Sequence, residues 1–339
     1  MPSAPETYAA LVTAILAQLE RGEMPWRRPW AFDRPGNLFT RRSYTGINVL
    51  ALMLAAQERG YRSSLWTTAT QAMERGGRVL AGELERPVHI AMMYMKSFTT
   101  TSGRGQRVVV RKLAGRSYPV YNLEQTRGLG RLVRPGRNLE LWNLECDRIV
   151  RAWPGAPRLV PDPERAFYRP ADDVVAIPDR DCFESDSRYY ATLFHELIHA
   201  TGHPTRLNRE SFRSPAIDFG SEAYAFEELV AELGAAFLCS ETGIGNATMQ
   251  DNAAYIGGWL KVLRRDRKKL FLAAFLAERA CDLVLGRVSG GKREVEAPDP
   301  GAQGAANMER AVAQPAMQAA RQTNTVVSTL EIASPHDPT

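Results

Sequence analysis

Apolar residues recur at helical spacing in three segments near the start of the chain, which predicts helices over residues 6–21, 46–60 and 68–77. The first two stripes each stop at a glycine, a residue that is common just past the end of a helix. Between them, the segment MPWRRPW at 24–30 carries two prolines and two tryptophans, which excludes a helix there.

The pattern changes near residue 78, where short runs rich in valine and tyrosine replace the helical stripes. The runs RVL, PVHIAMMYM, RVVVRKL and SYPVYNL are separated by glycine, serine and threonine clusters, as β-strands usually are. The first part of the chain is therefore predicted to hold helices first and a small antiparallel sheet after them.

The second part of the chain predicts two short strands followed by long helices. The strands fall in AFYRP and DVVAIP within 166–178, and helices are expected at about 187–201 and 221–240. A third helical stretch covers 251–286 and should break at the Gly257–Gly258 pair.

These elements indicate an α+β protein of two domains, in agreement with a length of 339 residues and a usual domain size of roughly 100 to 200. We expect a first domain over 1–130, a linker over 131–145, and a second, helical domain with a short sheet over 146–286. Beyond it, proline, alanine, glutamine, serine and threonine replace large apolar residues, so 287–339 is predicted to be a disordered tail.

Charge divides unevenly between the two parts. Residues 1–150 hold 22 Lys and Arg against 12 Asp and Glu, a net of +10, whereas the remaining residues hold 21 against 26, a net of −5. Opposite signs are expected if only the first part meets a polyanion.

Cysteine usage and the length of the apolar runs bear on the compartment. The four cysteines form no C-x-x-C pair, which argues against a thiolate zinc site or a disulfide framework and favours free thiols in a reducing cytoplasm. No basic region precedes the first apolar stretch, so no secretory signal is expected, and no run approaches the ~18 apolar residues of a membrane span. We therefore expect a soluble, cytoplasmic protein without a membrane partner.

The strongest chemical signal is H-E-x-x-H at residues 195–199. His195 and His199 lie four residues apart, on one face of the predicted helix, so both imidazoles can bind one ion. Glu196 between them can take the proton of a water activated by that ion. We predict the histidines as metal ligands and Glu196 as the catalytic residue. The alternative is a helix with two hydrogen-bonded histidines, which is weakened because three of the five histidines lie within nine residues.

A catalytic ion of this kind needs a third protein ligand. His203 does not keep the metzincin spacing and lies beyond the predicted helix end, so it is a weaker candidate, as a ligand or as a support for one. Glu228 on the next predicted helix is the better candidate, and Glu232 one turn later would hold a ligating imidazole in place. Glu227 points roughly 100° away from Glu228. The alternative for Glu228 and Glu232 is that they form the solvated acidic face of an amphipathic helix. Zn²⁺ is the default ion for two histidines and a glutamate, and Mn²⁺ also fits.

Cations and aromatic rings alternate in the first part of the chain, in the segments WRRPW at 26–30 and RRSY at 41–44. A basic groove with rings on which bases stack is how single strands are bound without sequence readout. The equally weighted alternative is a core that contains the tryptophans, with solvated arginines outside. The candidate DNA contacts are Trp26, Arg27, Arg28, Trp30, Arg41, Arg42, Tyr44, Asn48, Trp66, Arg111 and Lys112.

Several stretches, in order along the chain, resemble ArdC-type antirestriction proteins of plasmids and other mobile elements. They are YAALVTAILAQLERGEMPWRRPW, SYTGINVLAL, GGRVLAGE, VYNLEQTRGL, AFYRPADD, HELIHATGHPTRLNR, FGSEAYAFEELVAELGAAFL and AAYIGGWLKVL. The resemblance covers about residues 6–286. One departure is that the usual Gly-Glu-Lys-Gly turn of the family reads Gly-Glu-Leu-Glu at 82–85, and these residues are left out of the candidate site.

The resemblance implies an N-terminal domain that binds single-stranded DNA, a C-terminal zincin-like metallopeptidase domain, and a role in shielding incoming DNA from host restriction. Two other functions stay open. The chain either cleaves a host regulator or other protein substrate, with DNA binding only locating it, or shields DNA with a metal domain that is structural or vestigial. The intact Glu196 favours an active peptidase, because a structural site has no need of that carboxylate.

Overall fold

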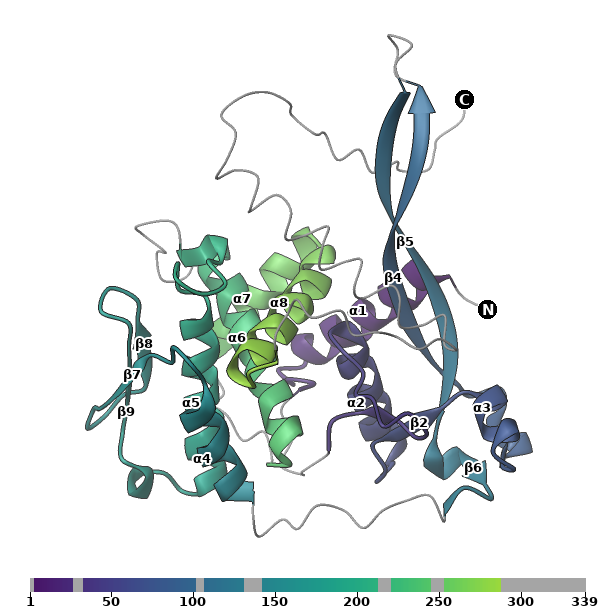
Figure 1. The fold of residues 1–339 in the computed structure, drawn as a ribbon, viewed down its shortest axis with the longest axis horizontal. Coiled ribbons are helices and arrows are strands. Elements are labelled where there is room, and N and C mark those ends of the chain that lie inside the picture. The colour runs from purple at the N-terminus through teal and green to yellow at the C-terminus, as the bar shows by residue number, and fades with distance from the viewer. Residues whose placement is uncertain are drawn as a thin grey trace. The chain divides into compact units, whose positions relative to one another are not determined.

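The structure, a computed structural model, describes residues 3–26, 33–101, 107–130, 142–212, 221–244 and 253–287. It divides into two compact units, of which the larger holds Met1–Ala91 with Arg116–Arg293 and the smaller holds Met92–Gly115 with Glu294–Thr339. The smaller unit is represented among the described residues by the outer parts of strands β4 and β5, which form a long two-stranded ribbon (Figure 1). The predicted tail lies outside the described residues beyond 287.

The three predicted N-terminal helices are confirmed as α1 (Ala4–Glu20), α2 (Ile47–Arg59) and α3 (Ala69–Glu74). Ser3 before α1 and Thr68 before α3 each form a capping box, which satisfies backbone N–H groups at the first turn. The glycine that ends α2 adopts a left-handed conformation, which only glycine tolerates readily.

The N-terminal part carries a mixed four-stranded sheet in the order β1-β2-β5-β4, and a separate two-stranded sheet of β3 and β6. The predicted antiparallel sheet is corrected in one respect, because β1 runs parallel to β2. RVVVRKL and SYPVYNL, predicted as separate runs, form one strand, since a glycine weakens a strand without ending it. The strands are β1 (Gly36–Asn37), β2 (Leu65–Thr67), β3 (Arg78–Val79), β4 (Val88–Thr101), β5 (Arg107–Asn122) and β6 (Thr126–Arg127).

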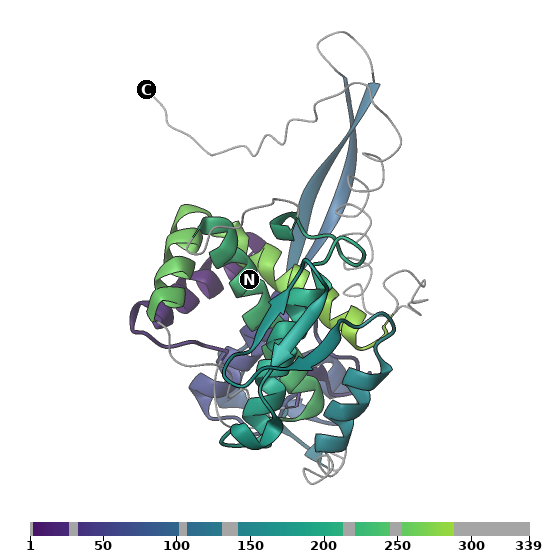
Figure 2. The same ribbon diagram turned by 90° about the vertical axis from the view of Figure 1, so that its left-hand side faces the viewer.

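The C-terminal part places a three-stranded sheet, in the order β7-β9-β8, against α5 (Figures 1 and 2). Both predicted strands are confirmed as β8 and β9, whereas β7 and α4 were not predicted, and α4 begins inside the predicted linker. The elements are α4 (Trp142–Ala152), β7 (Arg158–Pro161), β8 (Phe167–Arg169), β9 (Val174–Ile177), α5 (Asp186–Thr201), α6 (Glu222–Thr242), α7 (Ala253–Arg265) and α8 (Lys268–Val284).

The helical break predicted at Gly257–Gly258 lies elsewhere. Both glycines are inside α7, and the chain breaks after Arg265, where the Asp266 carboxylate accepts a hydrogen bond from the Lys268 N–H. A Cβ atom at Gly258 would lie 3.1 Å from the Cβ of Ala225 on α6. The glycine therefore lets two helices approach and does not end one.

One hydrophobic core joins helices from both predicted domains. Helix α6 lies at its centre and packs against α5, α7 and α8, while α1 and α2 contribute Val12, Ile15 and Leu50 to the same cluster. The domain boundaries at 130 and 146 stay a prediction, and the described residues on either side share this core. No helix in the described part of the chain is long and apolar enough to cross a bilayer.

Candidate metal centre

Helices α5 and α6 bring the H-E-x-x-H histidines against the acidic segment of the next helix. Helix α5 begins at Ser185, whose side chain caps it, and its residues from Tyr190 to Ile198 are buried. A Cβ atom at Gly234 of α6 would lie 2.8 Å from the side chain of Ile198, so this glycine lets the two helix axes come close. The close approach is what puts side chains of α5 within reach of carboxylates on α6.

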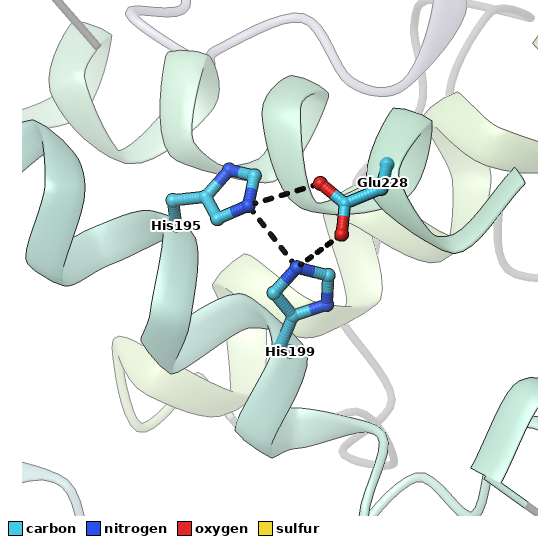
Figure 3. A group of neighbouring side chains, drawn as sticks. All are labelled: His195, His199 and Glu228. Carbon is cyan, nitrogen blue, oxygen red and sulfur yellow. Dashed lines mark hydrogen bonds and ion pairs between the residues drawn. The ribbon is translucent and has the colours of Figure 1, made fainter. Parts of the chain in front are cut away.

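Three ligand atoms converge between the two helices (Figure 3). The Nε2 atoms of His195 and His199 are 3.1 Å apart. His195 Nε2 lies 3.4 Å from Oε2 of Glu228, and His199 Nε2 lies 3.4 Å from Oε1 of the same carboxylate. All three ligand atoms lie within 4.8 Å of one another. His195 and Glu228 are buried, and the His199 side chain is 12% exposed, so the group is open to solvent at one side only.

These distances fit a single divalent ion. Ligand atoms about 2.1 Å from a tetrahedral ion lie roughly 3.4 Å apart. The separation of 3.4 Å between each imidazole and a Glu228 oxygen matches this spacing. The donor set of two nitrogens and one carboxylate suits zinc and manganese alike.

The electrostatics of the site favour a cation. Burial alone would lower the pKa of His195 and His199, but the Glu228 carboxylate and, less strongly, Glu196 raise the pKa of both. Burial likewise acts to raise the pKa of Glu228, yet the two histidines hold it well below its usual range. Glu196 itself is buried on α5. The carboxylates thus surround the imidazoles with negative potential.

Glu227 orients His199. Its Oε1 lies 3.3 Å from Nδ1 of His199, a contact that favours a proton on Nδ1 and so would leave Nε2 to a bound ion. Arg209 donates from Nε to Glu227 over 2.9 Å, and the Ser211 hydroxyl donates over 2.6 Å. Burial would raise the pKa of Glu227, but Arg209 and His199 lower it to about 2.

Arg209 also closes the end of α5. It donates to the Ile198 carbonyl over 2.9 Å and to the Thr201 hydroxyl over 2.6 Å, groups at the last turn of that helix. Since helix-end carbonyls lack partners within the helix, the guanidinium satisfies them while it holds Glu227 on α6. The Arg209 side chain, 3% exposed, therefore ties both metal-bearing helices together.

The sequence did not predict this arrangement around the histidines. Glu227 was set aside because it points away from Glu228, but that direction carries it to His199. Glu232, expected to hold an imidazole, has its Oε1 3.8 Å from Nδ1 of His195, too far for a hydrogen bond. His203 is corrected, because its Nδ1 pairs with the Thr205 hydroxyl at 2.7 Å and the residue is not part of the group.

Comparisons with known proteins find a matching family for each of the two parts of the chain. Residues 5–136 match the sequence model of the N-terminal domain of the anti-restriction factor ArdC, and residues 148–276 match that of a zincin-like metallopeptidase. The metal-free crystal structure of antirestriction protein ArdC from plasmid R388 is 33% identical, with a TM-score of 0.65, over 83% of this chain and 97% of that one. The chain belongs to the ArdC family of antirestriction proteins.

Other relatives of this ArdC-family chain differ in length. The Mn(II)-bound structure of the same R388 protein has a TM-score of 0.64 at 33% identity, over 83% of this chain and 97% of that one. A DNA primase TraC of Escherichia coli is 36% identical over 80% of this chain, which spans only 26% of that relative. The uncharacterized protein y4eC of Sinorhizobium fredii is 31% identical over 85% of this chain and 94% of its own length. The resemblance to ArdC proteins and the mixed fold are thereby confirmed.

Two of the rings that were expected to stack on DNA lie in the core of this ArdC-family chain. Trp26 is 2% exposed and packs edge-on against Trp259 of α7, with ring centroids 5.6 Å apart. Trp66 is fully buried and packs edge-on against Tyr61. The stacking role predicted for both tryptophans is wrong, because neither ring can meet a base without leaving the core.

The remaining DNA candidates divide by exposure. The Asn48 side chain exchanges two hydrogen bonds of 2.9 Å with the backbone of Ala91, so its amide fixes α2 to β4. Tyr44 is partly buried against the core, while Arg41 and Arg42 are exposed. Arg27, Arg28 and Trp30, and the side chains of Arg111 and Lys112, lie outside the described residues.

Proposed function

We propose that this ArdC-family protein protects the DNA of a mobile element by binding it as a single strand, and that its metal centre hydrolyses peptide bonds. The observation that carries the enzymatic half is the convergence of His195, His199 and Glu228 beside the buried Glu196. The DNA half rests on the net charge of +10 over residues 1–150 and on family membership.

The three converging side chains would hold Zn²⁺ or Mn²⁺, and the relative from plasmid R388 has been crystallised with Mn(II). A bound divalent ion supplies Lewis acidity at the scissile amide. Glu196 then acts as the general base, because its carboxylate lies on the same helix as both histidines and is withheld from bulk water. Glu227 keeps His199 in the tautomer that presents Nε2.

The decisive experiment compares the wild-type protein with Glu196→Gln, which keeps the size of the side chain and removes the general base. We expect the variant to retain one equivalent of metal and its affinity for single-stranded DNA, and to lose peptide cleavage. Glu164→Gln, an exposed glutamate away from the site, is the matched control. Proteomic comparison of cells that express each variant identifies cleaved proteins, and a cleavage pattern unchanged by Glu196→Gln would rule out this catalytic site.

The same variant separates the two rival roles of the metal domain. If protection of incoming DNA survives Glu196→Gln, shielding depends on DNA binding, and the peptidase serves another purpose or the metal domain is structural. If protection is lost while DNA affinity and metal content are intact, proteolysis of a host protein is the mechanism. The intact Glu196 between the two histidines favours the second result, in which protection is lost.

A further inference from the structure

An arginine pair lies on the small sheet formed by β3 and β6. Arg78 and Arg127 are cross-strand partners in this sheet, and both are exposed. Cross-strand partners point to the same face of a sheet. The next pair, Val79 with Thr126, points to the opposite face, where Val79 is 7% exposed. The two guanidinium groups therefore extend side by side from the solvent face.

Like charges directly opposite each other destabilise a sheet, so an anion bound between the two guanidinium groups would relieve their repulsion. Within the part of the chain that the structure describes, neither Arg78 nor Arg127 has an acidic partner. Glu83, which follows β3, is already engaged by Arg86 at 3.2 Å and by the amide of Gln125 at 2.9 Å. The arginine pair thus keeps its full positive charge at the surface.

A third arginine and an aromatic ring adjoin the pair. The Arg75 guanidinium lies over the Phe39 ring, 5.6 Å from its centroid. Phe39 packs on a small cluster that contains Leu129, two residues after Arg127. Gly77 lies very close to the segment that contains Arg127 and Leu129. A Cβ atom at Gly77 would lie 2.5 Å from the Leu129 side chain and 2.9 Å from the Arg127 carbonyl. The segment that ends with Gly77, and carries Arg75, therefore lies directly against the segment that carries Arg127.

We propose that this surface, made of Arg75, Arg78, Arg127 and Phe39 and here named the α3–β6 basic surface, binds single-stranded nucleic acid. The arginines contact successive phosphates, and the half-buried Phe39 ring with its stacked guanidinium offers a platform for a base. Leu80, 38% exposed, follows Arg78 on the same face and adds apolar area that an unstacked base can cover.

A single strand fits this surface better than a duplex does. Its bases are free to leave the stack and meet the ring, whereas a duplex presents only phosphates to it. The inference deepens the proposed DNA binding and rests on it. It also supplies exposed contacts in place of Trp26 and Trp66, which are buried.

The test uses the full-length protein and a fluorescein-labelled oligothymidylate, with affinity measured by anisotropy over a series of salt concentrations. Each phosphate contact on a single strand contributes about −0.7 to the slope of log K against log salt, so Arg78→Ala/Arg127→Ala should flatten the slope by roughly 1.4. At 0.1 M salt this corresponds to a loss on the order of tenfold in affinity. Arg78→Lys/Arg127→Lys keeps the charge and should retain most of the binding.

Arg158→Ala is the matched control, because Arg158 is an exposed strand arginine in the three-stranded β7-β9-β8 sheet of the same unit. Its slope and affinity should equal those of the wild type, and all variants should melt at the wild-type temperature. If the wild type fails to bind the oligonucleotide, the proposed DNA binding itself is wrong. If the wild type binds and the double alanine variant binds equally well, or loses affinity only for a duplex or an acidic peptide, the α3–β6 basic surface is not the site.

Discussion

Glu227 and Glu228 are neighbours in the chain, yet their carboxylates meet different groups. Glu228 faces the Nε2 atoms of both histidines, whereas Glu227 faces Nδ1 of His199 and is held by Arg209. A helix turns roughly 100° per residue, so the side chains of two adjacent residues can face different sides of one imidazole ring. One carboxylate is thus placed to bind an ion, and the other to fix the ring that binds it.

The metal ligands give the first prediction at the scale of residues. His195→Ala, His199→Ala and Glu228→Ala should each abolish the binding of about one equivalent of Zn²⁺ or Mn²⁺, because three protein ligands are the usual minimum for such a site. His203→Ala should retain the metal, since that imidazole is turned to Thr205. Inductively coupled plasma mass spectrometry on dialysed protein measures the metal content of each variant. Loss of metal in His203→Ala with retention in Glu228→Ala would reverse our assignment of the third ligand.

At the scale of elements, the site depends on the spacing of two helices more than on their composition. Helix α5 was predictable, because its apolar residues recur at helical spacing and the two histidines, four residues apart, lie on the same face of that helix. The prediction of Glu228 as a ligand already required α6 to lie beside α5, but not how closely the two axes approach, since that depends on Gly234, which meets Ile198. Strand β7 was missed because most of its residues are exposed and it is held by its pairing with β9. Helix α4 was missed although it is amphipathic, because its first residues were assigned to the linker.

Gly234→Ala tests this dependence. A Cβ there would meet three side-chain atoms of Ile198 at 2.8 Å, and a β-branched residue in a helix has little rotamer freedom to yield. Overpacking of this kind costs about 1–3 kcal/mol, which outweighs the ~1 kcal/mol that alanine contributes to helix propensity. We expect lower stability to urea and weaker metal affinity.

Gly257→Ala is the counterpart, because a Cβ at Gly257 of α7 meets nothing within 4 Å. This variant should gain stability by up to about 1 kcal/mol through helix propensity alone. Ile198→Ala combined with Gly234→Ala should show favourable coupling in a double-mutant cycle. Equal stability of the two single glycine variants would mean that α5 and α6 are not held at their closest approach.

At the scale of the whole molecule, the parts with opposite charge share a core. Composition and motifs predicted the chemistry of each part, but not whether Trp26 lies in a groove or in the core, since burial of a ring depends on its tertiary partner. That partner is Trp259, more than 200 residues away in the chain. The net charges of +10 and −5 therefore do not mean that the two parts fold independently.

A buried ion cluster joins the same two parts. Arg34, with its side chain 3% exposed, pairs with Glu241 of α6 at 3.2 Å and with Glu278 of α8. The guanidinium also donates to the Tyr44 carbonyl over 3.1 Å, and Glu278 accepts from the Gly46 N–H over 3.1 Å. The entry to α2 is thereby fixed to two helices that form the core around the metal centre.

Arg34→Met should reveal this coupling. It leaves the buried Glu278 without its cation, whereas Glu241 keeps its pair with Arg287 at 2.8 Å, and the loss is expected to cost about 3–5 kcal/mol. Arg21→Met removes an exposed pair with Glu23 and should cost about 0–1 kcal/mol.

Urea unfolding of the full chain is followed in parallel by tryptophan fluorescence, metal release and loss of oligonucleotide binding. If the core is shared, all three transitions coincide in the wild type and shift together to lower urea in Arg34→Met. Metal retained after DNA binding has been lost would instead show that the two parts unfold separately, and that the cluster lies between independent domains.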